Sequence, residues 1–156
     1  MTTTGDDIQL VSFRVGTQEF AFDILQVERI LRHVVPAPLP KAPGFLEGVV
    51  PYEGGAVPVV DLRKRFDLEA PIREETRLMV VDLGDQRVGV LVDEVREVMR
   101  VDSTTISAPG PMVNGLAAAY IAGIVTRPSR TIIILNARKL LSATERSALT
   151  GIGGGQ

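Results

Sequence analysis

"LVSFRVGTQEFAFDILQVERIL", residues 10–31, is matched without a gap by "LMVVDLGDQRVGVLVDEVREVM", residues 78–99, at an offset of 68 residues. Each copy holds 12 apolar residues in 22, and 10 positions are apolar in both, where random placement would give about 6 or 7. Identical pairs accompany the pattern, among them Gly16 and Gly84, Gln18 and Gln86, and Val27 and Val95. This repetition indicates a duplication and predicts two similar subdomains.

A second match continues the duplication at an offset of 75 residues. It joins "GVVPYEGGAVPVVDLRKRF", residues 48–66, to "GIVTRPSRTIIILNARKLL", residues 123–141. Asp61 and Asn136 then occupy equivalent places, and both are residue types that cap helices. Gly48 and Gly123 are also equivalent, and each is predicted to lie where a strand bends or another backbone approaches closely. The change of offset is explained by an extra loop, "APGPMVNG", in the second copy.

Each copy contains short runs rich in Val, Ile and Phe, which are typical of strands. The runs are broken by turn-forming pairs at Gly16-Thr17, Gly54-Gly55, Gly84-Asp85 and Ser129-Arg130. Four strands around one small core favour a barrel in each copy, because a closed sheet covers its own edges. The expected class is therefore mainly β.

Helical spacing predicts a turn or two of helix between the hairpins. The apolar residues with this spacing are Ile24, Val27, Ile30 and Leu31 in the first copy and Val95, Val98 and Met99 in the second. The segment "VPAPLPKAPG" has four prolines in ten residues and predicts an extended surface connection. Ser142 and Glu145 have capping-box spacing, which predicts a final helix over 143–150, with Gly151 as its stop and 151–156 as a flexible tail.

Composition limits the classes of function. A chain of 156 residues with 45% apolar content is long enough for one domain. Its 17 basic and 19 acidic residues create no excess positive field for phosphates or anionic lipid, so proteins are the expected partners and membrane insertion is not expected. The absence of cysteine and of a secretion signal fits a cytoplasmic protein.

No constellation of residues suggests an enzyme. The chain has no Cys and a single histidine, His33, so the commonest nucleophile-base and metal-ligand combinations are missing. No phosphate-binding loop of the nucleotide-dependent enzymes occurs. We therefore expect no catalytic residue, no metal and no cofactor.

Small barrels also bind single-stranded nucleic acid, and this remains the alternative function. Such binding needs stacking aromatics in a basic groove. Aromatic residues make up only 4% of the chain, and Phe13, Phe20 and Phe22 occupy positions that a core would claim. The basic cluster "DLRKR", residues 61–65, is either a solvated helix face or a protein-docking patch.

The order of several motifs resembles the CheW domain of bacterial chemotaxis from about Gln9 to Leu141. These motifs are "LVSFRVGTQEFAFDILQVERI", the proline-rich "PAPLPKAPGFLEGVV", "GGAVPVVDLRKRF", "RVGVLVDEVREVMRV", "YIAGIV" and "IIILNARKLL". The resemblance implies one domain, 1–156, of two SH3-like five-stranded β-barrel subdomains with short helices and a C-terminal helix. We place subdomain 1 at about 16–70 and subdomain 2 at about 71–141, with the N-terminal strand as a candidate for exchange.

The resemblance also implies function. Proteins of this family are non-catalytic adaptors that couple the cytoplasmic tips of chemoreceptors to a CheA-type histidine kinase. The kinase's regulatory domain is itself built like CheW and pairs with it pseudo-symmetrically. We accordingly expect a cytoplasmic scaffold, monomeric by itself, that binds this regulatory domain and a receptor tip and binds no nucleic acid. The expected protein-binding residues are Val27, Arg29, Ile30, Gly48, Tyr52, Glu53, Gly54, Val95 and Val98.

Two charges differ from the family's pattern. The family commonly has N-L-R-G where this chain has Pro51-Tyr52-Glu53-Gly54, and V-x-E-I where this chain has Val27-Glu28-Arg29-Ile30. An acid thus replaces an arginine linked to receptor binding, and Arg29 replaces an acid implicated in partner contact. Two interpretations stay open: Glu28 supplies the missing charge while Glu53 has drifted at an exposed turn, or the chain has a different receptor or kinase partner.

Overall fold

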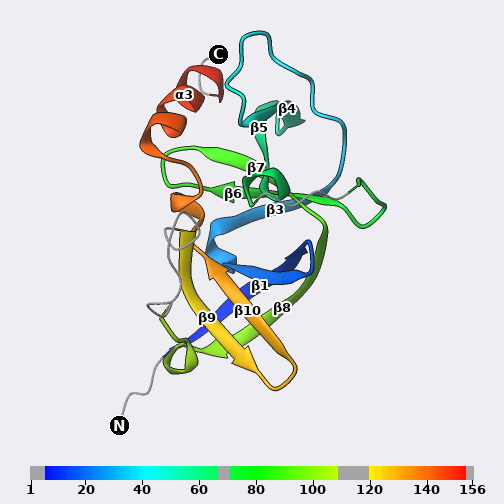
Figure 1. Cartoon of the computed structure of the whole chain (residues 1–156). Coiled ribbons are helices and arrows are strands. Elements are labelled where there is room, and N and C mark those ends of the chain that lie inside the picture. The colour runs from blue at the N-terminus through cyan, green and yellow to red at the C-terminus, as the bar shows by residue number, and fades with distance from the viewer. Residues whose placement is uncertain (1–5, 67–70, 109–119, 154–156) are drawn as a thin grey trace.

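The computed structural model describes residues 6–66, 71–108 and 120–153, which form two five-stranded sheets (Figure 1). Sheet A comprises β1 (Asp7–Val15), β2 (Gln18–Asp23), β8 (Glu94–Asp102), β9 (Ile121–Arg127) and β10 (Arg130–Leu135). Sheet B comprises β3 (Val27–Arg32), β4 (Leu46–Tyr52), β5 (Gly55–Asp61), β6 (Arg77–Asp82) and β7 (Arg87–Val92). The strand orders are β8-β1-β2-β10-β9 and β3-β6-β7-β5-β4, so the expected fold class is confirmed.

Each half of the duplicated chain gives its first two strands to the sheet of the other half. β1 and β2 join β8, β9 and β10 in sheet A, whereas β6 and β7 join β3, β4 and β5 in sheet B. The expected division into 16–70 and 71–141 therefore does not coincide with the division between the sheets. Local hairpins form within each half, but the parallel pairs β2–β10 and β5–β7 join segments far apart in sequence. The exchange thus involves a whole hairpin from each half.

The two sheets repeat each other in detail. Both contain one parallel pair at the same place in the strand order, between β2 and β10 in sheet A and between β7 and β5 in sheet B. Bulges recur at equivalent positions as well, at Glu28 in β3 and Arg96 in β8, and at Glu47 in β4 and Ala122 in β9. Bulges bend a strand and increase its twist, which helps a sheet to curl.

Gly48 and Gly123 lie where each sheet curls closed. Backbone hydrogen bonds join Ala37 to Val49 beside Gly48, and Ser107 to Ile124 beside Gly123. A Cβ atom at Gly48 would lie 2.3 Å from the carbonyl oxygen of Ala37, and one at Gly123 would lie 2.4 Å from a methyl carbon of Ile106. The prediction of close approach at these two glycines is therefore confirmed.

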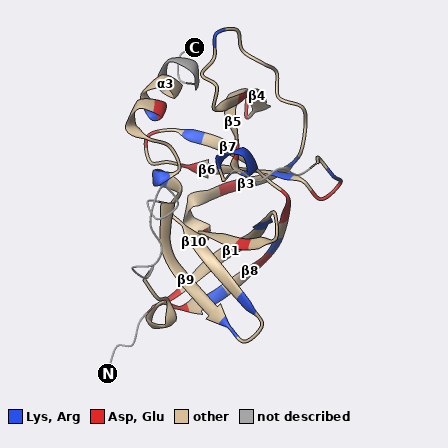
Figure 2. Cartoon of the chain, viewed as in Figure 1, with Lys and Arg blue, Asp and Glu red and all other residues tan. Residues whose placement is uncertain are grey.

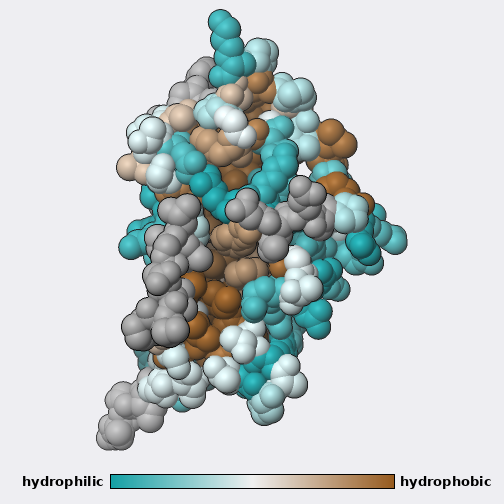
Figure 3. All heavy atoms as spheres, viewed as in Figure 1, coloured by the Kyte–Doolittle hydropathy of each residue, from teal (hydrophilic) through white to brown (hydrophobic). Residues whose placement is uncertain are grey.

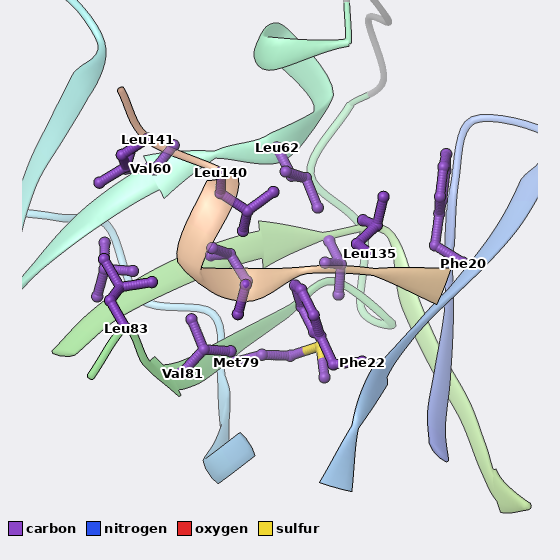
Figure 4. Packing of buried hydrophobic residues seen from close by; sticks show 14 of the residues in the cluster. Phe20, Phe22, Val60, Leu62, Met79, Val81, Leu83, Leu135, Leu140 and Leu141 are labelled. Atoms are coloured by element: carbon purple, nitrogen blue, oxygen red, sulfur yellow. The ribbon is translucent and has the colours of Figure 1, made fainter. Parts of the chain in front are cut away.

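The core has three parts. A large cluster lies between the two sheets, and Figure 4 shows its members Phe22, Met79, Leu83, Leu135 and Leu140 converging from strands and from the turns that follow them. Each sheet also encloses a smaller cluster, with Leu10 and Ile134 in sheet A and their repeat equivalents Leu78 and Val59 in sheet B. The duplicated barrels thus share one larger apolar interface, and this interface holds the pair together.

A buried ion cluster ties the two sheets at one end of this interface. Asp93 is the single residue between β7 of sheet B and β8 of sheet A. Its carboxylate accepts a hydrogen bond from the Gly16 backbone at 2.7 Å and another from Arg63 at 3.4 Å. Arg63 also donates to both carboxylate oxygens of Asp61 at 2.9 Å, and this hydrogen bonding raises the pKa of Arg63. The buried charges therefore compensate one another.

The prediction of helical turns between the hairpins is wrong for most of the residues concerned. In the first copy a 3-10 turn, η1 (Ile24–Gln26), covers Ile24 alone of these residues, and Val27, Ile30 and Leu31 belong to β3. Val95, Val98 and Met99 likewise belong to β8. Apolar residues at i, i+3 and i+4 are typical of one helical face, but here the bulges at Glu28 and Arg96 shift the alternation of each strand by one residue and produce the same spacing.

The remaining helical segments are capped as the sequence predicts. Asp61 and Asn136 accept hydrogen bonds from Arg63 and Arg138 at the starts of α1 (Leu62–Arg65) and η3 (Ala137–Lys139), and η2 (Ser103–Thr105) follows β8. Ser142 and Glu145 form the reciprocal capping box of α3 (Ala143–Gly153). This helix continues through Gly151, so the expected stop there is wrong, and residues 154–156 lie outside the described residues.

Candidate protein-interaction site

The β4–β5 hairpin turns through Glu53 and Gly54, whose φ angles are 49° and 81°. Tyr52 and Gly55 form the last pair of the ladder, so the connection has two residues. Positive φ at both central residues is typical of a type I′ turn, whose twist matches that of the flanking strands. Glu53 is therefore exposed at a tight turn, and Gly55 is the first residue of β5.

Three of the predicted contact residues lie on β3, an edge strand of sheet B. Val27 packs partly against the core between the sheets, whereas Ile30 is 40% exposed and Arg29 is exposed. The bulge at Glu28 separates Val27 from Arg29 and changes the direction of the side chains that follow it. β3 thus presents an apolar residue and two charges side by side.

The two reversed charges form an ion pair with each other. Nη2 of Arg29 lies 3.5 Å from Oε2 of Glu53, which joins β3 to the β4–β5 turn. Arg87, the first residue of β7, lies 2.8 Å from the Glu28 carboxylate and 3.7 Å from that of Glu53. We call Glu28, Arg29, Glu53 and Arg87 the charge cluster. Its two acids and two bases balance, so neither Glu53 nor Arg29 is an isolated charge.

Tyr52 lies beneath the charge cluster. The guanidinium carbon of Arg87 lies 6.0 Å from the centre of the Tyr52 ring, within range of a cation–π contact. The Tyr52 hydroxyl is buried and has no hydrogen-bond partner among the described residues. Burial raises the pKa of Tyr52, and the carboxylates of Glu28 and Glu53 raise it further. Tyr52, on β4, thus contacts the charge cluster through Arg87.

The other predicted site residues have different surroundings. Gly48 is buried, so it shapes the scaffold of the site rather than its surface. Val95 and Val98 lie on β8 in the other sheet, at the positions of the repeat that match Val27 and Ile30. Val98 is 54% exposed, so both copies of the repeat present an apolar side chain at the same place.

Sequence reasoning did not select Arg87. Glu28 and Arg87 are far apart in the chain, and no local pattern links them. The only sequence signal is the position of Arg87 just after the Gly84 turn, which places it at the start of a strand. Its role in the site comes from the exchange that brings β7 into the sheet of β3 and β4.

An apolar surface on sheet A was also not selected. Figure 3 shows brown side chains gathered in the lower half of the molecule, over the region of β9 and β10 in Figure 1. A hollow of about 290 Å³ beside this sheet is lined by Leu10 and Ile134 of the sheet and by Leu25 and Ile106 of the adjoining turns, among others. Leu25 is 88% exposed at its edge. The "APGPMVNG" loop lies almost entirely outside the described residues.

Other kinds of site find little support in the part of the chain that the structure describes. Phe13, Phe20 and Phe22 are buried in the core, so they cannot stack on nucleic-acid bases. Acidic and basic residues are interspersed over both sheets rather than gathered into one basic groove (Figure 2). Within the described ranges, no three His, Asp or Glu residues are grouped as metal ligands, and no helix is long and apolar enough to cross a membrane.

Comparison with known proteins identifies the class. Residues 9–145 match the CheW-like domain family, so the chain belongs to this family of non-catalytic chemotaxis scaffolds. A crystal structure of the scaffolding protein TtCheW from Thermoanaerobacter tengcongensis is similar, with a TM-score of 0.81 and 28% identity over 90% of this chain and 96% of that one.

Curated relatives are similar over most of their length. The chain is 27% identical to the chemotaxis protein CheW of Treponema pallidum, over 97% of this chain and 92% of the relative. It is 31% identical to the CheW of Bacillus subtilis, over 85% and 86%, and 33% identical to protein FrzA of Myxococcus xanthus, over 88% and 87%. The resemblance noted from the motifs is therefore confirmed.

Proposed function

We propose that this chain is a cytoplasmic adaptor that couples a chemoreceptor tip to the regulatory domain of a CheA-type histidine kinase. The single observation that carries the proposal is the family match over residues 9–145. The similar structure of a scaffolding protein supports it. The mechanism is scaffolding: the chain binds both partners at separate surfaces and holds them in one assembly. It contributes no catalytic group.

The receptor surface of this proposal is β3 with the β4–β5 hairpin. A receptor helix would place apolar side chains against Val27 and Ile30, while Arg29 and Glu53 meet its polar positions. Tyr52, whose hydroxyl is buried, would contribute the accessible part of its ring. Support comes from the exposure of Ile30 on an edge strand beside the charge cluster. Val95 and Val98 would extend the apolar contact from β8.

The kinase surface of this proposal lies on sheet A. The hollow lined by Leu25, Ile106 and Ile134 offers apolar area of the kind that desolvated interface centres use. Because it belongs to the other sheet from the charge cluster, the two partners would bind without competing. We expect the chain alone to be monomeric, since both surfaces are reserved for other proteins.

The reversed charges support altered partner specificity. Arg29 and Glu53 keep an ion pair, but with the acid and the base exchanged relative to the family's pattern. An exchange that preserves the pair leaves the fold undisturbed and inverts the charges that a partner meets. We therefore propose that the native partner carries complementary changes, because like charges across an interface are disfavoured.

Reconstitution tests the proposal. The purified chain would be mixed with the CheA-type regulatory domain and a soluble receptor-tip fragment encoded by the same genome, and complexes separated by sedimentation. We expect binary complexes with each partner and a ternary complex that requires the chain. A chain that binds neither protein but binds a single-stranded oligonucleotide tightly at ~150 mM salt would support the nucleic-acid alternative instead.

A further inference from the structure

Arg87 is the hub of the charge cluster. Its Nε lies 2.8 Å from Oε1 of Glu28 and its Nη1 lies 3.7 Å from Oε1 of Glu53, while its guanidinium covers the Tyr52 ring. Arg87 thus contacts β3, β4 and the turn between β4 and β5 from its own place at the start of β7. Arg87 is thus paired with both acids of the cluster, whereas Arg29 is paired with Glu53.

Arg29 has spare hydrogen-bonding capacity. Among the described residues its only acidic partner is Glu53, which it meets through one nitrogen at 3.5 Å. The Arg29 side chain is 56% exposed, more than any other member of the cluster. A guanidinium carries five N–H donors in a planar fork that fits a carboxylate through two parallel hydrogen bonds. Most of this fork is open to an incoming acid.

We propose that Arg29 binds a carboxylate of the receptor tip and that Arg87 is the positioning residue that keeps Arg29 available. The inference rests on the proposed function and assigns its partner an acidic side chain. Without Arg87, Glu28 and Glu53 would have no cation except Arg29, and both would compete with the partner for it. With Arg87 in place, each acid already has a cation and the fork of Arg29 faces solvent.

The first experiment tests the role of Arg87 without any partner. Tyr52 is the probe, and Tyr120→Phe removes the only other tyrosine. The charged groups around Tyr52 are Glu28 and Arg29 on β3, Glu53 in the turn and Arg87 on β7; the acids raise its pKa and the arginines lower it. We expect Arg87→Gln to raise the pKa further, Arg87→Lys to have little effect and the remote Arg127→Gln to have none. The pKa of Tyr52 is measured from tyrosinate absorbance as a function of pH. Identical titration curves for all variants would overturn the positioning role of Arg87.

The second experiment measures affinity for the CheA-type regulatory domain and the receptor-tip fragment from the same genome. We expect Arg29→Gln to weaken binding to the receptor-tip fragment about fivefold and to reduce its salt dependence, because an exposed charge pair contributes up to about 1 kcal/mol. Affinity for the kinase regulatory domain should stay unchanged, and a loss there instead would overturn the assignment to the receptor. Arg87→Gln should weaken the same complex by a smaller factor, and Arg87→Lys should restore it. The matched control is Arg127→Gln, because Arg127 is an exposed arginine at the β9–β10 end of sheet A.

The outcomes separate the two proposals. If the unmodified chain binds neither protein, the proposed function fails and this inference fails with it. If the chain binds but Arg29→Gln behaves like Arg127→Gln, the coupling function stands and the assignment of Arg29 is wrong. If Arg29→Gln weakens binding to an oligonucleotide but leaves binding to both proteins unchanged, Arg29 binds a phosphate and the assignment of a carboxylate is wrong.

Discussion

Single residues decide how the proposed receptor surface is charged. Arg29 and Glu53 neutralise each other across two elements, and Arg87 neutralises Glu28 and Glu53 in turn. This arrangement decides which of the two charges, Glu53 or Arg29, is available to a partner. Glu53 has two cations beside it already, so a basic partner gains little from it, whereas Arg29 keeps open donors. The reversal is best described as one exchange of a pair rather than as two independent substitutions.

A double-mutant cycle tests whether the pair acts as a unit. Glu53→Arg places a third guanidinium beside Arg29 and Arg87, and Arg29→Glu gathers three acids around Arg87. We expect each single change to lower the free energy of unfolding by less than about 1 kcal/mol, and the double change to recover most of the loss. Thermal melts of all four proteins at low and high salt measure the coupling. Additive losses would show that the pair is not coupled.

The same four proteins test partner choice. We expect the double variant, which restores the family's usual polarity, to lose affinity for the native partner several-fold and to gain affinity for a receptor tip from an ordinary chemotaxis system. Titration calorimetry against both tips measures this. Unchanged affinities in the double variant, with its melting temperature preserved, would mean that the exchange is drift.

A backbone position near the site is expected to be far more sensitive. Gly48 has a φ of 142°, and a Cβ there would meet the Ala37 carbonyl at 2.3 Å. We therefore expect Gly48→Ala to lower the free energy of unfolding by about 2 kcal/mol or more. Gly55→Ala in the same hairpin is the control, because its Cβ would meet nothing closer than the Tyr52 carbonyl at 3.8 Å. Denaturant unfolding measures both free energies. Equal losses for Gly48→Ala and Gly55→Ala would contradict the predicted steric clash at Gly48.

Among the elements, α3 is docked by a small number of polar contacts as well as by its apolar face. Arg146 donates to the Leu83 and Arg138 carbonyls at 3.1 Å and to Asp85 at 2.5 Å. The contacts with Leu83 and Asp85 hold the turn between β6 and β7 against the helix, and Arg87 follows directly after that turn. Leu149 adds a fully buried apolar contact. The helix therefore stabilises the same hairpin that carries the hub of the charge cluster.

The docking of α3 should respond to acid. The hydrogen bond from Arg146 holds the pKa of Asp85 below its ordinary value of 3.8. A depressed pKa in the folded state contributes stability above that value, and the contribution disappears as the pH falls through the lower folded pKa. We expect Asp85→Asn to lower the melting temperature near neutral pH and to have progressively less effect below about pH 4. If the difference in melting temperature between the unmodified chain and Asp85→Asn stays constant from pH 7 to pH 3, the role assigned to the Asp85–Arg146 pair is wrong.

The whole molecule is held together by reciprocal exchange. Each sheet takes three strands from one half of the chain and two from the other, and the largest apolar cluster lies between the sheets. The buried contacts among Asp61, Arg63, Asp93 and the Gly16 backbone join the same two units. Neither half contains a complete sheet, so the two barrels form one cooperative unit rather than two independent ones.

Cutting the chain tests this. We expect fragments 1–70 and 71–156 each to lack a cooperative melting transition, because each would leave one hairpin without its sheet. When the fragments are mixed, we expect a native-like circular dichroism spectrum and a concentration-dependent melt. A fragment that folds alone with a cooperative transition would show that the halves are autonomous and that the exchange is secondary.

The sequence by itself determined the features that depend on local patterns. Paired apolar runs and glycine turns predicted the strands and the duplication, equivalent glycines predicted two close approaches, and capping residues predicted the helix starts. The motif order identified the family and pointed to Arg29 and Glu53. Only the tertiary structure decided that these two charges pair, that Arg87 joins them and that the hairpins exchange sheets. The reason is physical: these contacts join segments far apart in the chain, and their energy comes from burial and charge complementarity in the assembled fold, which no local window of sequence contains.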